Sequence, residues 1–251
     1  MYYYIMEPAG RKSALWQEKV KNILGDLGIA GETVMPSAAR TIEELASLGV
    51  VKGYSTIVAV GSEKIVDKVV TALINQQGSQ DVVLGIIPEN YNSTMAKKIR
   101  VNDVYDACNT LKYRKLEIID VCHISPNKYF LTEAVLESQK SVDAYITVGE
   151  VKAGLPFNKI TIKPGLKIFI EDANSHQGTK NKLLGWLFKP KEKKDIYSSF
   201  FHSKKIEIET LDVTLPVKVD EEVIAKTPII CSNRPKALKI IVARDTISMK
   251  E

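Results

Sequence analysis

Short apolar runs alternate with segments of helical period over the first part of the chain, residues 1–112. The apolar runs at 2–6, 56–60 and 82–87 predict strands. Between the first two runs, apolar side chains recur at the spacing of one helix face, at Trp16, Val20, Ile23, Leu24 and Leu27. Strands that alternate with helices in this way predict an α/β domain with a mostly parallel sheet.

Helix-end signals support this assignment. Gly28 follows the first helical segment and suits a left-handed helix end. Thr41 and Glu44 have the spacing of a capping box, which predicts the start of a second, short helix. A third helix is predicted from a buried-face pattern at Val66, Val69, Val70 and Leu73.

The period changes after Lys112, where apolar residues alternate with polar ones. This alternation is found at residues 166–170, 206–208, 217–219 and 238–242. It places every second side chain on a buried sheet face and predicts a mainly antiparallel β-sandwich. We therefore expect two domains, 1–112 and 113–251, with the junction at 112–115, where the last helix gives way to a strand at 116–124. The last residues are expected to pack back on the first domain.

Composition narrows the function classes. The 251 residues are 45% hydrophobic, which is enough to bury a core. The net charge of +5 favours phosphates or anionic lipid and does not indicate nucleic acid. The cysteines Cys108, Cys122 and Cys231 are far apart, and the histidines show no ligand spacing, so we expect neither a disulfide framework nor a metal site.

The N-terminal residues do not resemble a signal peptide, and no apolar run approaches the roughly 20 residues needed to span a bilayer. We expect a cytoplasmic protein and leave open whether it binds peripherally to a membrane. A homo-oligomer is also left open.

Two loops follow the second and third predicted strands. The first is Gly61-Ser-Glu-Lys-Ile65, and the second is Pro88-Glu-Asn-Tyr-Asn-Ser-Thr-Met-Ala96, which continues from Leu84-Gly-Ile-Ile-Pro88. The first predicted strand runs into Glu7-Pro-Ala-Gly10. Near the C-terminus stand Lys205-Ile-Glu-Ile-Glu-Thr210, Leu215-Pro-Val-Lys-Val-Asp-Glu-Glu222 and Thr227-Pro228.

These segments resemble the diacylglycerol kinase catalytic family, which includes bacterial lipid kinases and sphingosine kinases and shares its architecture with NAD kinases. The corresponding family segments are Gly-Gly-Asp-Gly-Thr, Pro-x-Gly-Thr-x-Asn-Asp-Phe-Ala, Asn-Pro-x-x-Gly and a stretch that leads into Val-Asp-Gly-Glu. The resemblance covers most of the chain and is loose over residues 125–200. It implies ATP and Mg²⁺ as cofactors and ATP-dependent phosphorylation of a lipid hydroxyl.

Both loops depart from the family pattern where phosphate would bind. Gly61 keeps a glycine, but Ser62 and Lys64 would each cost about 1 kcal/mol or more in a left-handed conformation. Glu63 is an acid of longer reach than the family's aspartate, and Ile65 has no hydroxyl. Loss of one preorganised donor can cost about 100- to 1,000-fold in rate, so these changes argue against transfer by the family's mechanism.

The resemblance gives candidate roles to individual residues. Glu222 is a candidate general base, with Asp220 beside it, and the alternative is that both stand at an exposed acidic hairpin tip. Arg11 and Lys12 would bind phosphate at a helix start or simply be solvated there, and Lys64 would neutralise phosphate or face solvent. The candidate cofactor-binding residues are Gly10, Arg11, Lys12, Gly61, Glu63, Lys64, Pro88 and Asn90.

A further segment suggests membrane contact. Leu183-Leu-Gly-Trp-Leu-Phe188 is apolar and is followed by the basic side chains Lys189, Lys191, Lys193 and Lys194. Apolar burial and attraction to anionic lipid would add in such a segment. A short core helix followed by a charged loop is the alternative.

Two functions remain in competition. One is a lipid kinase with altered loops, and the other is a catalytically degenerate relative that binds a lipid, a nucleotide or a protein. An NAD kinase is disfavoured, because it requires the same glycine-rich loop.

Overall fold

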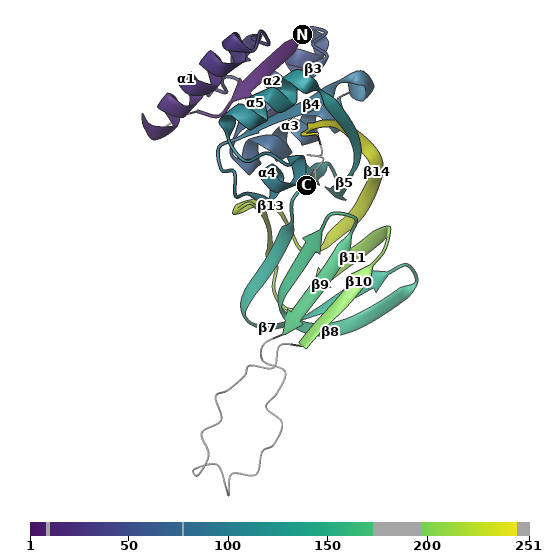
Figure 1. Cartoon of the computed structure of the whole chain (residues 1–251). Coiled ribbons are helices and arrows are strands. Elements are labelled where there is room, and N and C mark those ends of the chain that lie inside the picture. The colour runs from purple at the N-terminus through teal and green to yellow at the C-terminus, as the bar shows by residue number, and fades with distance from the viewer. Residues whose placement is uncertain (9–10, 77, 173–196, 245–251) are drawn as a thin grey trace, which may run out of the picture. The chain divides into compact units, whose positions relative to one another are not determined.

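The structure is a computed structural model that describes residues 1–8, 11–76, 78–172 and 197–244 (Figure 1). Among the described residues, two compact units are present, one made of residues 1–132 with residues 234–244, and the other lying within Glu133–Asn233. The change from helix to strand at 112–115 lies inside the first unit, between the last helix and the strand that follows it. Residues 235–244 belong to the first unit, whereas the last residues, 245–251, which were expected to pack on the first domain, lie outside the described part of the structure.

The first unit alternates strands and helices in the predicted order. Its elements are β1 (Tyr2–Met6), α1 (Arg11–Asp26), β2 (Glu32–Val34), α2 (Ile42–Val51), β3 (Thr56–Gly61), α3 (Glu63–Asn75), the 3-10 helix η1 (Ser79–Asp81), β4 (Val83–Pro88), α4 (Thr94–Ile99), α5 (Val104–Tyr113), β5 (Lys115–Ile124) and β6 (Lys128–Phe130). The strands β4, β3, β1 and β2 are neighbours in that order, and all of these pairs are parallel. The predicted α/β fold is confirmed.

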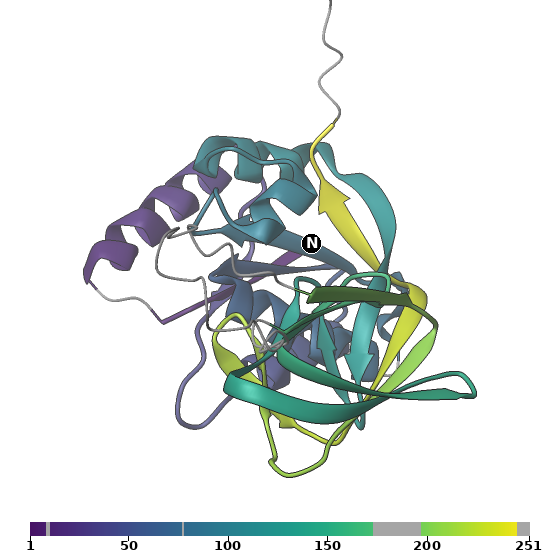
Figure 2. The ribbon, with the colours of Figure 1, turned by 90° about the horizontal axis from the view of Figure 1, so that it is seen from below.

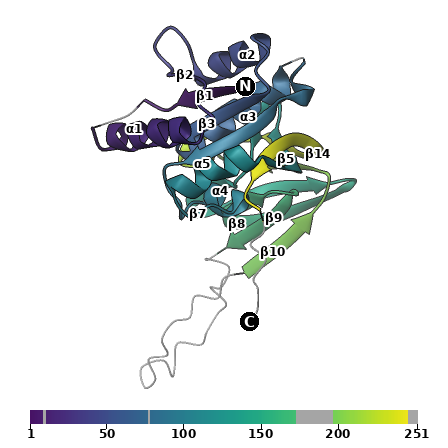
Figure 3. The same cartoon turned by 45° about the horizontal axis from the view of Figure 1, so that its top comes forward.

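Burial explains why the parallel strands are continuous apolar runs. Every residue of β3 and β4 is buried, because helices cover both faces of the sheet. Figure 3 shows α1 and α2 on opposite sides of β1. The helix faces predicted from the sequence pack into this core, with Val20, Val66, Val69 and Val70 almost fully buried.

The predicted capping box is present at the start of α2. The backbone N–H of Glu44 donates to Thr41 Oγ1 at 3.2 Å, and the backbone N–H of Thr41 donates to Glu44 Oε2 at 2.8 Å. Helix α1 ends at Asp26, two positions before Gly28, which has the left-handed φ of +70°. Both local sequence signals therefore mark real helix ends.

The second unit is built from antiparallel strands. They are β7 (Ala134–Val148), β8 (Val151–Lys163), β9 (Lys167–Asp172), β10 (Tyr197–His202), β11 (Lys205–Thr210), β12 (Pro216–Val219) and β13 (Glu222–Lys226), with the first residues of β14 (Ile229–Val242). The order is β10-β9-β8-β7-β11-β14, and Figure 2 shows the strong curvature of these strands. The register of β7 shifts between Glu137 and Val142, so its first part pairs with β12 and its last part with β11.

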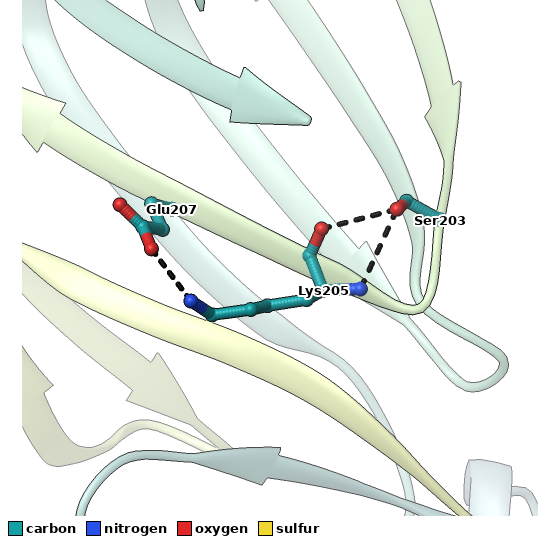
Figure 4. Close-up of polar contacts among 3 residues, drawn as sticks. All are labelled: Ser203, Lys205 and Glu207. Carbon is teal, nitrogen blue, oxygen red and sulfur yellow. Dashed lines mark hydrogen bonds and ion pairs between the residues drawn. The ribbon is translucent and has the colours of Figure 1, made fainter. Parts of the chain in front are cut away.

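The predicted alternation of apolar and polar residues is clear in β11. Ile206 and Ile208 are fully buried, whereas Lys205 and Glu207 lie on the opposite face and form an ion pair of 2.8 Å (Figure 4). Just before this strand, Ser203 Oγ donates a hydrogen bond to the carbonyl of Lys205 at 3.0 Å. One face of the sheet packs inward, and the other faces solvent and carries paired charges. Apolar and polar residues therefore alternate along the strand.

Candidate functional site

The strand order places a candidate site at the carboxyl ends of β1 and β3. From β1 the chain passes through α1 to β2 on one side, and it then returns through α2 to β3 on the other side of β1. In open parallel sheets, ligands bind outside the strand ends at such a change of direction. Glu7 follows β1 at this point, and Gly61 and Ser62 stand at the junction of β3 and α3.

Glu7 binds the N-terminus of α3. Its Oε2 accepts the backbone N–H of Ser62 at 2.7 Å, and its Oε1 accepts the Ser62 hydroxyl at 2.9 Å. The backbone of Glu7 is fixed as well, since its N–H donates to the Val60 carbonyl at 3.0 Å and its carbonyl accepts Gln17 Nε2 at 2.6 Å. A carboxylate thus lies on the positive end of α3, where a free backbone donor favours an anion.

Gly61 makes this contact sterically feasible. Its φ is +146°, a conformation that residues with a side chain rarely adopt. A Cβ at Gly61 would lie 2.6 Å from Glu7 Oε2 and 2.7 Å from Glu7 Cβ. Gly61, which the family resemblance assigns to phosphate binding, therefore leaves space for the Glu7 side chain.

Glu63 connects the first loop to the second. This half-buried residue opens α3, and its Oε1 accepts the backbone N–H of Met95 at 2.6 Å. Ser93 caps the same short helix, α4, by accepting the N–H of Ala96 at 3.1 Å. The acid that the family resemblance assigns to cofactor binding is thus used to hold α4.

Asn90 and Pro88 shape the second loop. Asn90 Oδ1 accepts the backbone N–H of Asn92 at 2.9 Å, which forms a local turn. Pro88 is the last, buried residue of β4 and lies opposite Gly61 in the register of β3 and β4. Next to it, Glu89 donates its N–H to the Gly61 carbonyl at 2.9 Å and accepts the Ser13 hydroxyl at 2.8 Å.

Lys64 and Tyr91 occupy different environments. Lys64 is exposed on α3, whereas Tyr91 is half-buried and packs against the core of the first unit. Burial raises the pKa of the Tyr91 hydroxyl to about 12, and the nearby Trp16 indole opposes this shift. Among the described residues, neither the Tyr91 hydroxyl nor the Trp16 N–H has a hydrogen-bond partner of good geometry.

The start of α1 is only partly described. Gly10 and the side chains of Arg11 and Lys12 lie outside the described part of the structure, although α1 does begin at Arg11. Their role in phosphate binding stays a prediction. The apolar and basic segment at 183–194 also lies outside the described residues.

Asp220 and Glu222 belong to the second unit, where β12 and β13 form a hairpin. Asp220 and Glu221 form its turn with φ values of +48° and +66°, and Glu222 pairs with Val219 at the start of β13. Asp220 and Glu222 are half-buried, and Glu221 is exposed. The turn also borders a cavity of about 300 Å³ within this unit. The catalytic roles of Asp220 and Glu222 stay predictions.

Solved structures with the same arrangement of elements identify the fold. A diacylglycerol kinase from Bacillus anthracis superposes with a TM-score of 0.71 at 15% identity, over 96% of each chain. Another structure from this organism, assigned the same activity, gives a TM-score of 0.74 at 15% identity over 96% of each chain. The chain has the diacylglycerol kinase fold. An NAD kinase from Archaeoglobus fulgidus in complex with ATP is a more distant match, with a TM-score of 0.47 at 15% identity over 97% of this chain and 94% of that one.

The diacylglycerol kinase fold is therefore present without a match at the level of sequence. No protein-family model and no curated protein sequence matches the chain. The fold expected from the resemblance is confirmed, whereas an identity of 15% carries no residue roles with it.

The residues on this diacylglycerol kinase fold do not fit a magnesium-nucleotide site at the first loop. The Ser62 backbone donor is bound to Glu7, and one Glu63 carboxylate oxygen is bound to the N–H of Met95. Within the described residues, no group of three or more His, Cys, Asp or Glu side chains is placed to hold a metal ion. None of the described helices is both long and apolar enough to cross a membrane.

Glu7 is a site residue that the sequence alone does not reveal. In the sequence it is only the first residue of the Glu7-Pro8-Ala9-Gly10 motif, and no partner can be assigned to it from that motif. An acidic residue directly after a first parallel strand, with glycine ending a neighbouring strand, is the signal that could have indicated the contact.

Proposed function

We propose that this protein is a catalytically degenerate form of the diacylglycerol kinase fold that binds anionic lipid surfaces and does not transfer phosphate. Binding replaces catalysis in this proposal. The fold supplies a scaffold, and the groups that would position phosphate serve its internal structure.

The hydrogen bond between Glu63 and Met95 carries the argument. Phosphoryl transfer needs carboxylates that hold metal and donors that face the transferred phosphate. Glu63 Oε1 instead lies 2.6 Å from the backbone nitrogen of Met95 and fills a donor at the start of α4. A metal at Glu63 would have to compete with a charge-assisted hydrogen bond of about 1.5–3 kcal/mol.

Several features support a lipid surface as the binding partner. The structures with the same fold are named diacylglycerol kinases, which act on a lipid. The net charge of +5 favours anionic headgroups. The sequence at 183–194 combines apolar side chains with lysines, which is typical of segments that insert into the interface of a bilayer.

Phosphate transfer is tested with the wild-type protein, ATP, Mg²⁺ and vesicles that contain diacylglycerol or sphingosine. We expect no lipid phosphate above a protein-free control and no thermal shift with millimolar ATP and Mg²⁺. A ligand at 100 times its dissociation constant would add about 2.7 kcal/mol of stability, so binding would be visible. Lipid phosphorylation by the purified protein would refute the proposal.

Lipid binding is tested by flotation with phosphatidylglycerol-containing vesicles. The double variant Trp186→Ser with Leu187→Ser should float less than the wild type, because it removes apolar area from the membrane-contact segment. Val51→Ser is the matched control, since Val51 is 72% exposed on α2 and lies far from this segment in the sequence. Equal flotation of the double variant and the wild type would contradict insertion by this segment.

A further inference from the structure

The N-terminus of α3 already holds an anion, and that anion belongs to the chain. Glu7 places one carboxylate oxygen 2.7 Å from the Ser62 nitrogen and the other 2.9 Å from Ser62 Oγ. Both oxygens are therefore used. A phosphate at a helix N-terminus is bound in the same way, through a backbone N–H and a nearby hydroxyl.

The surroundings are shaped around this carboxylate. Gly61 has no Cβ where one would lie 2.6 Å from Glu7 Oε2, so the strand end leaves space for the carboxylate. Gln17 and Val60 hold the backbone of Glu7 at 2.6 Å and 3.0 Å. The contact is thus fixed in two ways: the backbone of Glu7 is held in place, and Gly61 leaves space for the Glu7 carboxylate.

Tethering makes Glu7 a strong competitor. A group joined to its binding site by a short, ordered connection acts at an effective concentration of millimolar or more. Free phosphate in the same concentration range would also meet the charge of Glu7 at close distance. The carboxylate therefore excludes anions both by occupying the donors and by electrostatic repulsion.

We infer that Glu7 is an autoinhibitory residue, an internal anion that closes the N-terminus of α3 to phosphate groups. The class of ligand that it excludes is inorganic phosphate and the phosphates of a nucleotide. Glu7 sets what this edge of the sheet can bind, and its removal exposes the Ser62 donors.

The experiment compares phosphate binding by the wild type, Glu7→Ala and Glu7→Gln, measured by isothermal titration with inorganic phosphate and, separately, with ATP. Glu7→Ala is expected to bind phosphate about tenfold or more tightly than the wild type, equivalent to about 1.4 kcal/mol. Glu7→Gln removes the charge and keeps a hydrogen-bond acceptor, so it is expected to show a smaller gain. It also serves if Glu7→Ala fails to fold, because any gain over the wild type supports the inference.

The matched control is Glu89→Ala. Glu89 is an exposed carboxylate directly after β4, at the same edge of the sheet, and its side chain binds the Ser13 hydroxyl and not α3. It changes the net charge by the same amount. A gain in Glu89→Ala as large as that in Glu7→Ala would overturn the inference, and so would phosphate affinities that are equal in the wild type and both Glu7 variants.

This inference extends the proposed function, because a Glu7 carboxylate that blocks phosphate binding would explain why the protein does not transfer phosphate. The two proposals can nevertheless fail separately. The proposed function falls if the wild type phosphorylates lipid. The role of Glu7 falls if its removal leaves phosphate affinity unchanged, whatever the wild type does to lipid.

Discussion

Replacing Gly61 by alanine should destabilise the protein through both its backbone and its neighbour Glu7. The φ of +146° at Gly61 is nearly restricted to glycine, and holding another residue there costs about 1–3 kcal/mol. The new Cβ would also lie 2.7 Å from Glu7 Cβ, so Glu7 must move. That movement breaks hydrogen bonds to a charged group, worth about 1.5–3 kcal/mol each. We expect the free energy of unfolding to fall by about 3 kcal/mol or more.

The assay is urea denaturation followed by circular dichroism, which gives the midpoint and the slope of the transition. Gly25→Ala is the control. Gly25 lies in α1, and a Cβ added there would meet nothing within 4 Å, so alanine should stabilise the helix by roughly 0.5–1 kcal/mol. Opposite signs for two Gly→Ala changes would show that the loss at Gly61 is local.

A double-mutant cycle with Glu7→Ala tests the cause. The hydrogen bonds between Glu7 and Ser62 can be lost only once, so the double variant should lose less stability than the sum of the single losses, by about 0.5–3 kcal/mol. A double variant whose loss equals that sum would refute the reasoning. A loss below about 1 kcal/mol for Gly61→Ala alone would refute the backbone argument as well.

Four further predictions concern the first unit and use urea denaturation, the last of them as a function of pH. Thr41→Ala should cost about 1 kcal/mol, because it removes the side-chain acceptor from the capping box of α2. Glu63→Ala should cost about 1.5–3 kcal/mol by leaving the Met95 N–H without its carboxylate, and Glu63→Gln should recover part of this loss. Tyr91→Phe should raise stability by about 1 kcal/mol, because it removes a buried hydroxyl that has no hydrogen-bond partner of good geometry among the described residues. Tyr4→Phe should lower stability by about 1 kcal/mol by removing the hydrogen bond to the Ile29 carbonyl. Because the pKa of Tyr91 is raised to about 12, the wild type should lose stability as pH rises from about 10 towards 12, and Tyr91→Phe should lack this part of the loss.

The fold was predictable where burial acts on whole elements. The strand β1 coincides with the apolar run at 2–6, because a central parallel strand is buried on both faces and reads as a continuous run. The strand β2, Glu32–Val34, was missed. It has three residues, pairs with β1 alone among the described strands and buries no side chain fully, so it leaves no periodic signal.

The site was predictable only in part, because its contacts join residues far apart in sequence. The sequence placed Gly61 and Glu63 in a loop that follows a strand, whereas Gly61 is the last residue of β3 and Glu63 is already the first residue of α3. It gave no indication that Glu7 would bind Ser62, since that pairing depends on β1 and β3 lying side by side. A residue that departs from a family motif, such as Glu7, can thus make a contact within the protein. Only the tertiary structure shows whether such a residue makes a contact.

Two glutamates at the carboxyl edge of the parallel sheet use backbone donors of neighbouring helices. Glu7 holds the start of α3, and Glu63 holds the start of α4. A bound phosphate would need these N–H groups, so folding stability and phosphate binding compete for the same donors. A variant that gains phosphate binding by removing either acid must therefore lose the stability that the acid provided. If the proposed function holds, the internal contacts of Glu7 and Glu63 exchange ligand binding for folding stability.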